Sequence, residues 1–137
     1  MKIIGPGTIS GFWAGILFEH VRSFEVTLDR NLGHGFTING ADDNQISYNK
    51  ITGNGGGYGI LLFIAARNLV SNNQVFSNHS GIVIEHSDNS SVGNTITHNT
   101  SRETADGDMG DTWFDCTHNT WTNNGFGTRT RPASSNL

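Results

Sequence analysis

The sequence has little of what most compact domains depend on. Of its 137 residues, one is cysteine and two are proline, and charged residues make up only 15%. A single cysteine, Cys116, excludes an internal disulfide and leaves the redox compartment open. The longest apolar run, residues 60–66, is far too short for a membrane-spanning helix. We therefore expect no membrane partner.

The chain also lacks a surplus of basic residues and a secretory leader. Its formal net charge is −4, whereas nucleic-acid binding normally requires a basic face. The segment Gly5-Pro6-Gly7 interrupts the apolar stretch that a signal peptide would need after Lys2. The sequence therefore predicts no nucleic-acid partner, and the chain as given would be cytoplasmic.

Glycine and asparagine are abundant instead, and both recur at fixed positions. Residues 15–18, 35–38, 59–62 and 81–84 share the pattern Gly-apolar-x-apolar, with spacings of 20, 24 and 22 residues. Such self-similarity at twenty-odd residues is typical of solenoid proteins.

An asparagine motif follows these segments. Asn-x-apolar-x-x-Asn occurs in residues 49–54, 73–78, 94–99 and 119–124. Asparagine tolerates the left-handed backbone of sharp corners, and stacked amides can bond to one another along the solenoid axis. We expect a further, weaker asparagine ladder through Asn44, Asn68 and Asn89.

The repeat predicts short parallel strands that bury one face each and must stack to form a core. The fold class is all-β, a right-handed parallel β-helix solenoid of about six coils. Residues 1–128 form this domain, and residues 129–137 lack the repeat and are expected to be a mobile tail. Stacking predicts three interior columns: Ile16, Phe36, Ile60 and Ile82; Phe18, Ile38, Leu62 and Ile84; and Leu28, Ile51, Val75, Ile96 and Trp121.

The Gly-Ile-x-Ile segment followed by Asn-x-Ile-x-x-Asn resembles the right-handed parallel β-helix repeat of the pectate-lyase-like superfamily, over residues 7–127. That superfamily includes polysaccharide lyases, glycosidases, epimerases and phage tailspikes. The resemblance implies an extracellular or periplasmic setting and polysaccharide as a partner. It does not select an activity, because lyases of this fold hold Ca²⁺ with clustered aspartates and use a Lys or Arg base, and no such cluster occurs here at matching positions of adjacent coils.

The repeat breaks at residues 100–112, where acidic residues replace the expected Gly-apolar strand. We expect a solvated acidic loop that ends the regular pairing. If the chain binds a divalent metal, Ca²⁺ is the candidate because it prefers oxygen ligands, with Asp106, Asp108 and Asp111 as the ligands. The neighbouring residues Trp113, Glu103 and Arg102 are the candidate ligand-binding residues.

Three functions remain open from the sequence. The leading hypothesis is a β-helix module that binds carbohydrate or assembles with other chains without catalysis. The alternatives are a polysaccharide lyase or epimerase acting on acidic polysaccharide, and a structural fragment of a spike-like fibre. The first coil offers Ile3, Ile4, Ile9 and Phe12 without a capping segment, so the sequence also predicts a homo-oligomer or a part of a larger chain.

Overall fold

The computed structural model describes residues 2–11, 13–18, 22–87, 90–112 and 118–127. Every regular element in these residues is a β-strand, and all their pairings are parallel. No helix in the described part of the chain is long and apolar enough to cross a membrane. The predicted all-β class is confirmed.

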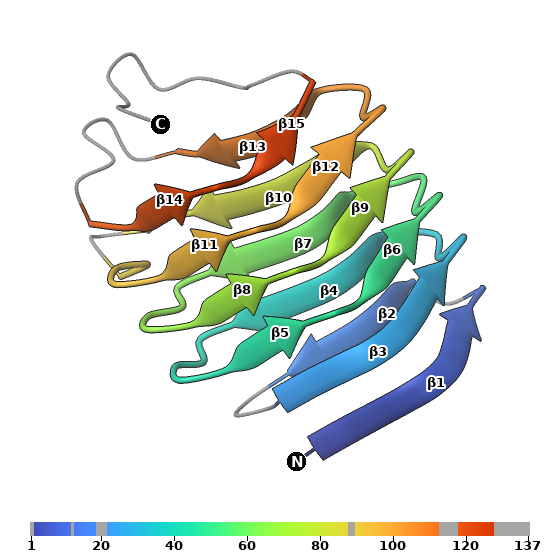
Figure 1. The fold of residues 1–137 in the computed structure, drawn as a ribbon, viewed down its shortest axis with the longest axis horizontal. Coiled ribbons are helices and arrows are strands. Elements are labelled where there is room, and N and C mark those ends of the chain that lie inside the picture. The colour runs from blue at the N-terminus through green and yellow to red at the C-terminus, as the bar shows by residue number, and fades with distance from the viewer. Residues whose placement is uncertain (1, 12, 19–21, 88–89, 113–117, 128–137) are drawn as a thin grey trace.

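The strands form three faces of a solenoid, two in front and one behind in Figure 1. The first face contains β2 (Ala14–Phe18), β4 (His34–Asn39), β7 (Tyr58–Phe63), β10 (Ser80–Glu85) and β13 (Gly107–Asp111). The second contains β5 (Gln45–Ser47), β8 (Leu69–Ser71), β11 (Thr95–Thr97) and β14 (Thr120–Thr122). The third contains β6 (Lys50–Thr52), β9 (Gln74–Phe76), β12 (Thr100–Arg102) and β15 (Gly125–Phe126).

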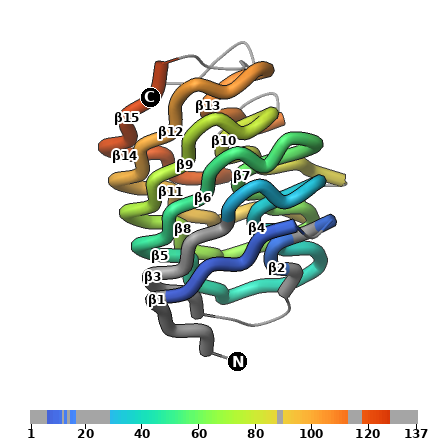
Figure 2. Tube along the Cα trace, turned by 90° about the vertical axis from the view of Figure 1, so that its right-hand side faces the viewer, coloured from blue at the N-terminus to red at the C-terminus, as the bar shows by residue number. Residues whose placement is uncertain are grey.

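Two long strands form the amino-terminal end of the solenoid. β3 (Arg22–Asp29) pairs with β5 through its first half and with β6 through its second half, so it spans both front faces. β1 (Lys2–Ser10) lies below β3 in Figure 1 and pairs with it. Figure 2 shows the coils stacked from the amino-terminal end at the bottom to β15 near the top.

The solenoid has about four turns, fewer than the six coils that the repeat predicts. The first face has five strands, and four turns connect them. The segment before β2 supplies β1 but no first-face strand, so it adds only part of a coil.

Two of the predicted interior columns are confirmed by the strand register. Ile16 is aligned with Phe36, Phe36 with Ile60, and Ile60 with Ile82. The second column aligns Ile38, Leu62 and Ile84 in the same way. The described side chains of both columns are fully or almost fully buried. Met109 extends the first column into β13, opposite Ile82.

The predicted third column is wrong in part, because it joins members of two different faces. Its first three residues, Leu28, Ile51 and Val75, are aligned as predicted. Ile51 is aligned with Val75 on the third face, whereas Ile96 is aligned with Val70 and Trp121 on the second. The asparagine motif has an internal spacing of five residues, so a shift of five places asparagine on asparagine again. The sequence pattern alone therefore does not separate the two columns.

Three asparagine ladders run along the solenoid at its corners. In each, a side-chain amide donates to the side-chain oxygen of the asparagine one coil further on, at 2.8–3.1 Å. The ladders comprise Asn44, Asn68, Asn94 and Asn119; Asn49, Asn73, Asn99 and Asn124; and Asn31, Asn54 and Asn78, the first of which donates through its backbone. Asn94 occupies the position predicted for Asn89, which lies outside the described residues.

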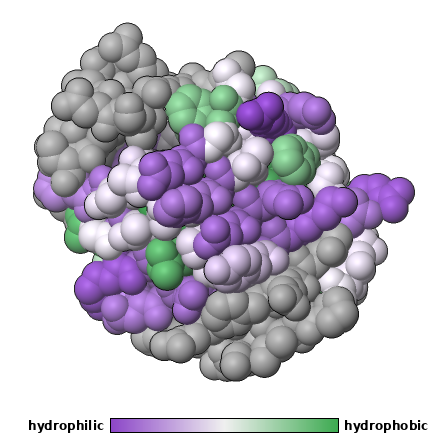
Figure 3. All heavy atoms as spheres, in the orientation of Figure 1, coloured by the Kyte–Doolittle hydropathy of each residue, from purple (hydrophilic) through white to green (hydrophobic). Residues whose placement is uncertain are grey.

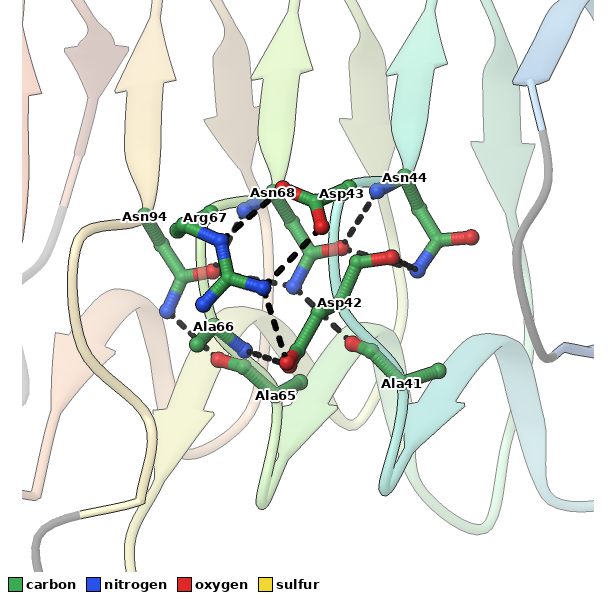
Figure 4. Close-up of polar contacts among 9 residues, drawn as sticks. All are labelled: Ala41, Asp42, Asp43, Asn44, Ala65, Ala66, Arg67, Asn68 and Asn94. Atoms are coloured by element: carbon green, nitrogen blue, oxygen red, sulfur yellow. Dashed lines mark hydrogen bonds and ion pairs between the residues drawn. The ribbon is translucent and has the colours of Figure 1, made fainter.

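A charged cluster beside the first ladder joins two coils (Figure 4). The Arg67 guanidinium donates to Asp42 Oδ2 at 3.1 Å and to Asp43 Oδ1 at 3.0 Å. Asp42 also accepts a bond from the backbone N–H of Ala66 at 2.8 Å. Asp43 and Arg67 both have positive φ, so these residues form the sharp turn at the corner. All three side chains are well exposed, and such pairs contribute little stability.

Candidate functional site

The acidic segment does not interrupt the solenoid, contrary to the sequence expectation. Residues 107–111 form β13, which continues the first face in register with β10. Gly107 and Asp108 lie in the chain where Ser80 and Gly81 lie one coil earlier. The backbone pairing of the coil is therefore kept, although polar residues replace some of its aliphatic positions.

The three candidate metal ligands each have a different partner. Asp106 Oδ2 bonds His79 Nε2 at 2.8 Å on the surface. Asp108 is buried and accepts bonds from Thr104 Oγ1 at 2.8 Å and from the backbone of Gly127 at 2.8 Å. Within the described residues, no three His, Cys, Asp or Glu side chains are grouped as an ion site. The structure therefore does not gather the aspartates, and Ca²⁺ binding stays a prediction.

Asp111 takes the position of an interior aliphatic residue. It is aligned with Ile84, and its Oδ1 bonds His86 Nε2 at 2.7 Å, with both side chains only 3% exposed. Its Oδ2 accepts a bond from Asn119 at 3.0 Å. A buried carboxylate needs such partners, so we assign Asp111 to the end of the core.

The predicted ligand-binding residues are not brought together on the first face. Arg102 ends β12 on the third face, and Glu103 occupies the following corner, where it accepts a bond from Ser77 Oγ at 3.0 Å. Trp113 lies outside the described residues. Their role in binding stays a prediction.

A different group of side chains lines the edge of the first face where its strands begin. We name Trp13, Leu32, His34 and Tyr58 the aromatic edge. Trp13 is 75% exposed and Leu32 66% exposed, the two highest values among the large apolar residues described. Both side chains are therefore open to solvent at the strand starts, where a ligand could reach them.

Glycines make room for these rings. Gly33 faces Trp13 from the next coil, and a side chain there would collide with the Trp13 carbonyl and lie 3.5 Å from the indole Cε2. A Cβ at Gly57 would lie 2.5 Å from Nδ1 of His34. The His34 ring therefore lies over Gly57 of the following coil, and Gly33 leaves room for the Trp13 carbonyl.

His34 and Tyr58 form the centre of the edge. Their rings stack with centroids 5.3 Å apart and planes 7° from parallel. The backbone N–H of Tyr58 donates to His34 Nδ1 at 3.1 Å, and the Tyr58 hydroxyl donates to Glu85 Oε1. The bond to Glu85, with a smaller effect of burial, raises the pKa of Tyr58 to about 12. Burial lowers the pKa of His34, against the opposing effect of Glu85.

Asp106 and His79 continue the same edge in the later coils. The backbone N–H of Asp106 donates to the His79 carbonyl at 3.0 Å, so the two residues are neighbours across the coils. The charge of Asp106 also acts on Tyr58. The edge therefore runs from exposed rings to carboxylates over successive coils.

The two front faces differ from this edge. Figure 3 shows them covered mostly by hydrophilic residues, with apolar residues in small separate spots. Hydroxyl groups on neighbouring coils of the second face bond to each other, the buried pair Ser47 and Ser71 at 2.8 Å and the exposed pair Thr122 and Thr97 at 3.0 Å. We therefore place the candidate site at the aromatic edge.

A family model described as a right-handed beta helix region matches residues 7–137. The chain belongs to this right-handed β-helix family. No curated protein and no solved structure matches it. Family membership of the β-helix chain establishes its fold and handedness, and its function has to be argued from the site. The match also extends over residues 129–137, the segment predicted as a tail.

Sequence reasoning missed the aromatic edge of this β-helix. It favoured Trp113 because that residue adjoins the acidic segment. In the structure Glu85 bonds Tyr58, and His86 bonds Asp111 in the interior. The available signal was the glycines before the first-face strands, which mark where rings of the preceding coil lie.

Proposed function

We propose that this chain is a carbohydrate-binding β-helix module that works without catalysis and binds a polysaccharide along its aromatic edge. The observation that carries the proposal is that the exposed Trp13 ring precedes β2 at the same edge where the His34 and Tyr58 rings stack. Sugar rings present flat C–H faces that pack against aromatic rings, and their hydroxyl groups bond to carboxylates and amides. Glu85 and Asp106 supply such acceptors beside Tyr58.

The spacing of the rings also suits an extended chain. Successive coils are separated by the strand spacing of about 4.8 Å, and the edge offers a ring or a polar group at each coil. A linear polysaccharide parallel to the solenoid axis would contact several coils at once. Several weak contacts of this kind add up to useful affinity.

The bonding of the acidic groups favours binding over catalysis. A general acid or base must be within reach of the substrate proton. Here the Glu85 carboxylate accepts from Tyr58, Asp106 bonds His79, and Asp111 is buried against His86. Each carboxylate therefore has a partner that fixes its orientation, and Glu85 and Asp106 can still accept a sugar hydroxyl through their second oxygens.

Calorimetry with a panel of neutral, acidic and amino oligosaccharides tests the proposal. Replacement Trp13→Ala removes the most exposed ring, and we expect affinity to fall about tenfold or more because one ring–sugar contact of roughly 1–3 kcal/mol is lost. Tyr48→Ala is the matched control, since Tyr48 is 59% exposed at the corner between the second and third faces. Equal effects of the two variants would contradict the assignment.

The enzyme alternative needs a separate assay. Incubation of each oligosaccharide with the wild-type chain, followed by measurement of new reducing ends and unsaturated products, should show no turnover. Turnover that Tyr58→Phe or Glu85→Gln abolishes would replace the binding proposal with a catalytic one.

A further inference from the structure

The carboxylates described near Tyr58 carry charges of one sign: Asp106 precedes β13, and Glu85 ends β10, where the Tyr58 hydroxyl reaches it. Glu85 and Asp106 both act on Tyr58 and raise its pKa. His34 stacks on the same ring, and burial lowers its pKa, so it is neutral near pH 7. The described charges that act on Tyr58 are therefore negative, and His79 bonds one of these carboxylates, Asp106.

The lysine and arginine side chains that the structure describes do not offset this charge. Arg67 lies with Asp42 and Asp43 at another corner, and Lys50 and Arg102 lie on the third face. Arg30, at the corner before Leu32, is held by Asp29 at 2.8 Å. A uronic acid at the edge would therefore meet carboxylates without a described cation to receive it.

We propose that the aromatic edge selects glycans with free amino groups, whose ammonium group binds at Glu85 beside the Tyr58 ring. This inference depends on the proposed function and names its ligand class. A cation gains from the face of an aromatic ring and from a charge-assisted bond to a carboxylate. The Tyr58–Glu85 pair provides both groups at one place, and Asp106 adds a further negative charge nearby.

The charge of the preferred ligand distinguishes this site from a site that binds acidic polysaccharide. Like charges brought together in a partly buried site repel, so galacturonic acid oligomers are disfavoured. A neutral N-acetylated sugar keeps the ring contacts but loses the attraction to Glu85. The order of affinity we expect is amino sugar, then N-acetylated sugar, then uronic acid.

Calorimetry on the full chain tests the order with β-1,4-linked glucosamine oligosaccharide, its fully N-acetylated counterpart and galacturonic acid oligosaccharide of equal length, at a pH where the sugar amines are protonated. We expect the amino oligomer to bind most tightly and its affinity to fall as salt is raised. Glu85→Gln should weaken only that oligomer, by roughly tenfold, because a charged hydrogen bond becomes a neutral one.

Asp43→Asn is the matched control, since it removes one negative charge at the Arg67 corner, and it should leave all three affinities unchanged. Asp106→Asn serves as the second variant if Glu85→Gln does not fold. N-acetylated or acidic oligomer binding as tightly as the amino oligomer would overturn this inference and leave the proposed function standing. Absence of binding by all three, and by the wider panel, would overturn both.

Discussion

At the scale of single residues, the interior columns carry the stability of the fold. Ile82 is fully buried between Ile60 and Met109, the equivalent residues of the coils on either side. A stack of this kind has no loop that can move in to fill a gap. The loss of one aliphatic side chain from this column should therefore leave a cavity.

We predict that Ile82→Ala lowers the free energy of unfolding by about 2–5 kcal/mol, the range for buried aliphatic truncations. Urea denaturation measures this difference. Leu69→Ala is the control, because Leu69 lies on the second face and is only partly buried. Equal losses for the two variants would mean that Ile82 does not lie in the interior.

The stacked His34–Tyr58 pair makes stability depend on pH at both ends of the range. The pKa of Tyr58 is raised to about 12 from its usual 10, so its contribution is complete below pH 10 and is lost as pH rises toward 12. The pKa of His34 is lowered, so its contribution is present above pH 6.5 and is lost as pH falls below that value.

Melting temperature measured against pH checks both signs. Tyr58→Phe should remove part of the alkaline loss, and His34→Gln should remove part of the acid loss. An alkaline profile that Tyr58→Phe leaves unchanged would contradict the hydrogen bond to Glu85.

At the scale of elements, the asparagine ladders fix how the coils align. Buried Asn73 shows the pattern fully: its oxygen accepts from the backbone and side chain of Asn49 at 2.9 Å, and its amide donates to Ile46 and Asn99 at 2.9 Å. Replacing Asn73 by alanine removes the hydrogen-bond partner of buried polar groups on Ile46, Asn49 and Asn99.

We predict that Asn73→Ala costs roughly 2 kcal/mol or more, since each unsatisfied buried group costs about 1–3 kcal/mol. Asn39→Ala, at an exposed position at the end of β4, should change stability by less than about 0.5 kcal/mol. Denaturant unfolding of both variants provides the comparison, and a small loss at Asn73 would show that the ladder is dispensable.

The elements also show which part of the fold could be predicted from sequence. The Gly-apolar strands were placed correctly because alternation over four residues and a twenty-odd-residue repeat fix both strand and register. The alignment of Ile51 with Ile96 failed because the asparagine motif repeats every five residues within a coil. β13 was missed because Asp108 and Asp111 stand where earlier coils have Gly81 and Ile84, and burial of a carboxylate depends on partners such as His86 and Asn119.

The aromatic edge could not be predicted from the sequence, for a related reason. The sequence favours Trp113 because it adjoins the acidic segment, and only the stacking of the coils shows that Trp13 lies against Gly33 and stays exposed. The bond from Tyr58 to Glu85 joins residues that are 27 positions apart. Neither relation follows from local spacing, because each depends on the number of residues in the intervening loops.

At the scale of the whole molecule, the solenoid divides its tasks among surfaces. The interior columns and asparagine ladders hold about four turns together, and the two front faces present polar side chains (Figure 3). The aromatic edge is the surface where exposed rings and carboxylates from successive coils meet. Association of several chains remains a prediction of the sequence, and it would multiply the edges available to one polysaccharide.

The most direct test of carbohydrate binding at the aromatic edge is a crystal structure of the chain with a bound oligosaccharide. We predict a sugar ring packed on the Trp13 indole and the sugar chain continuing along the solenoid axis past His34 and Tyr58, whose hydroxyl reaches Glu85 at the end of β10. An oligosaccharide held on the second face, with the Trp13 ring uncovered, would contradict this prediction.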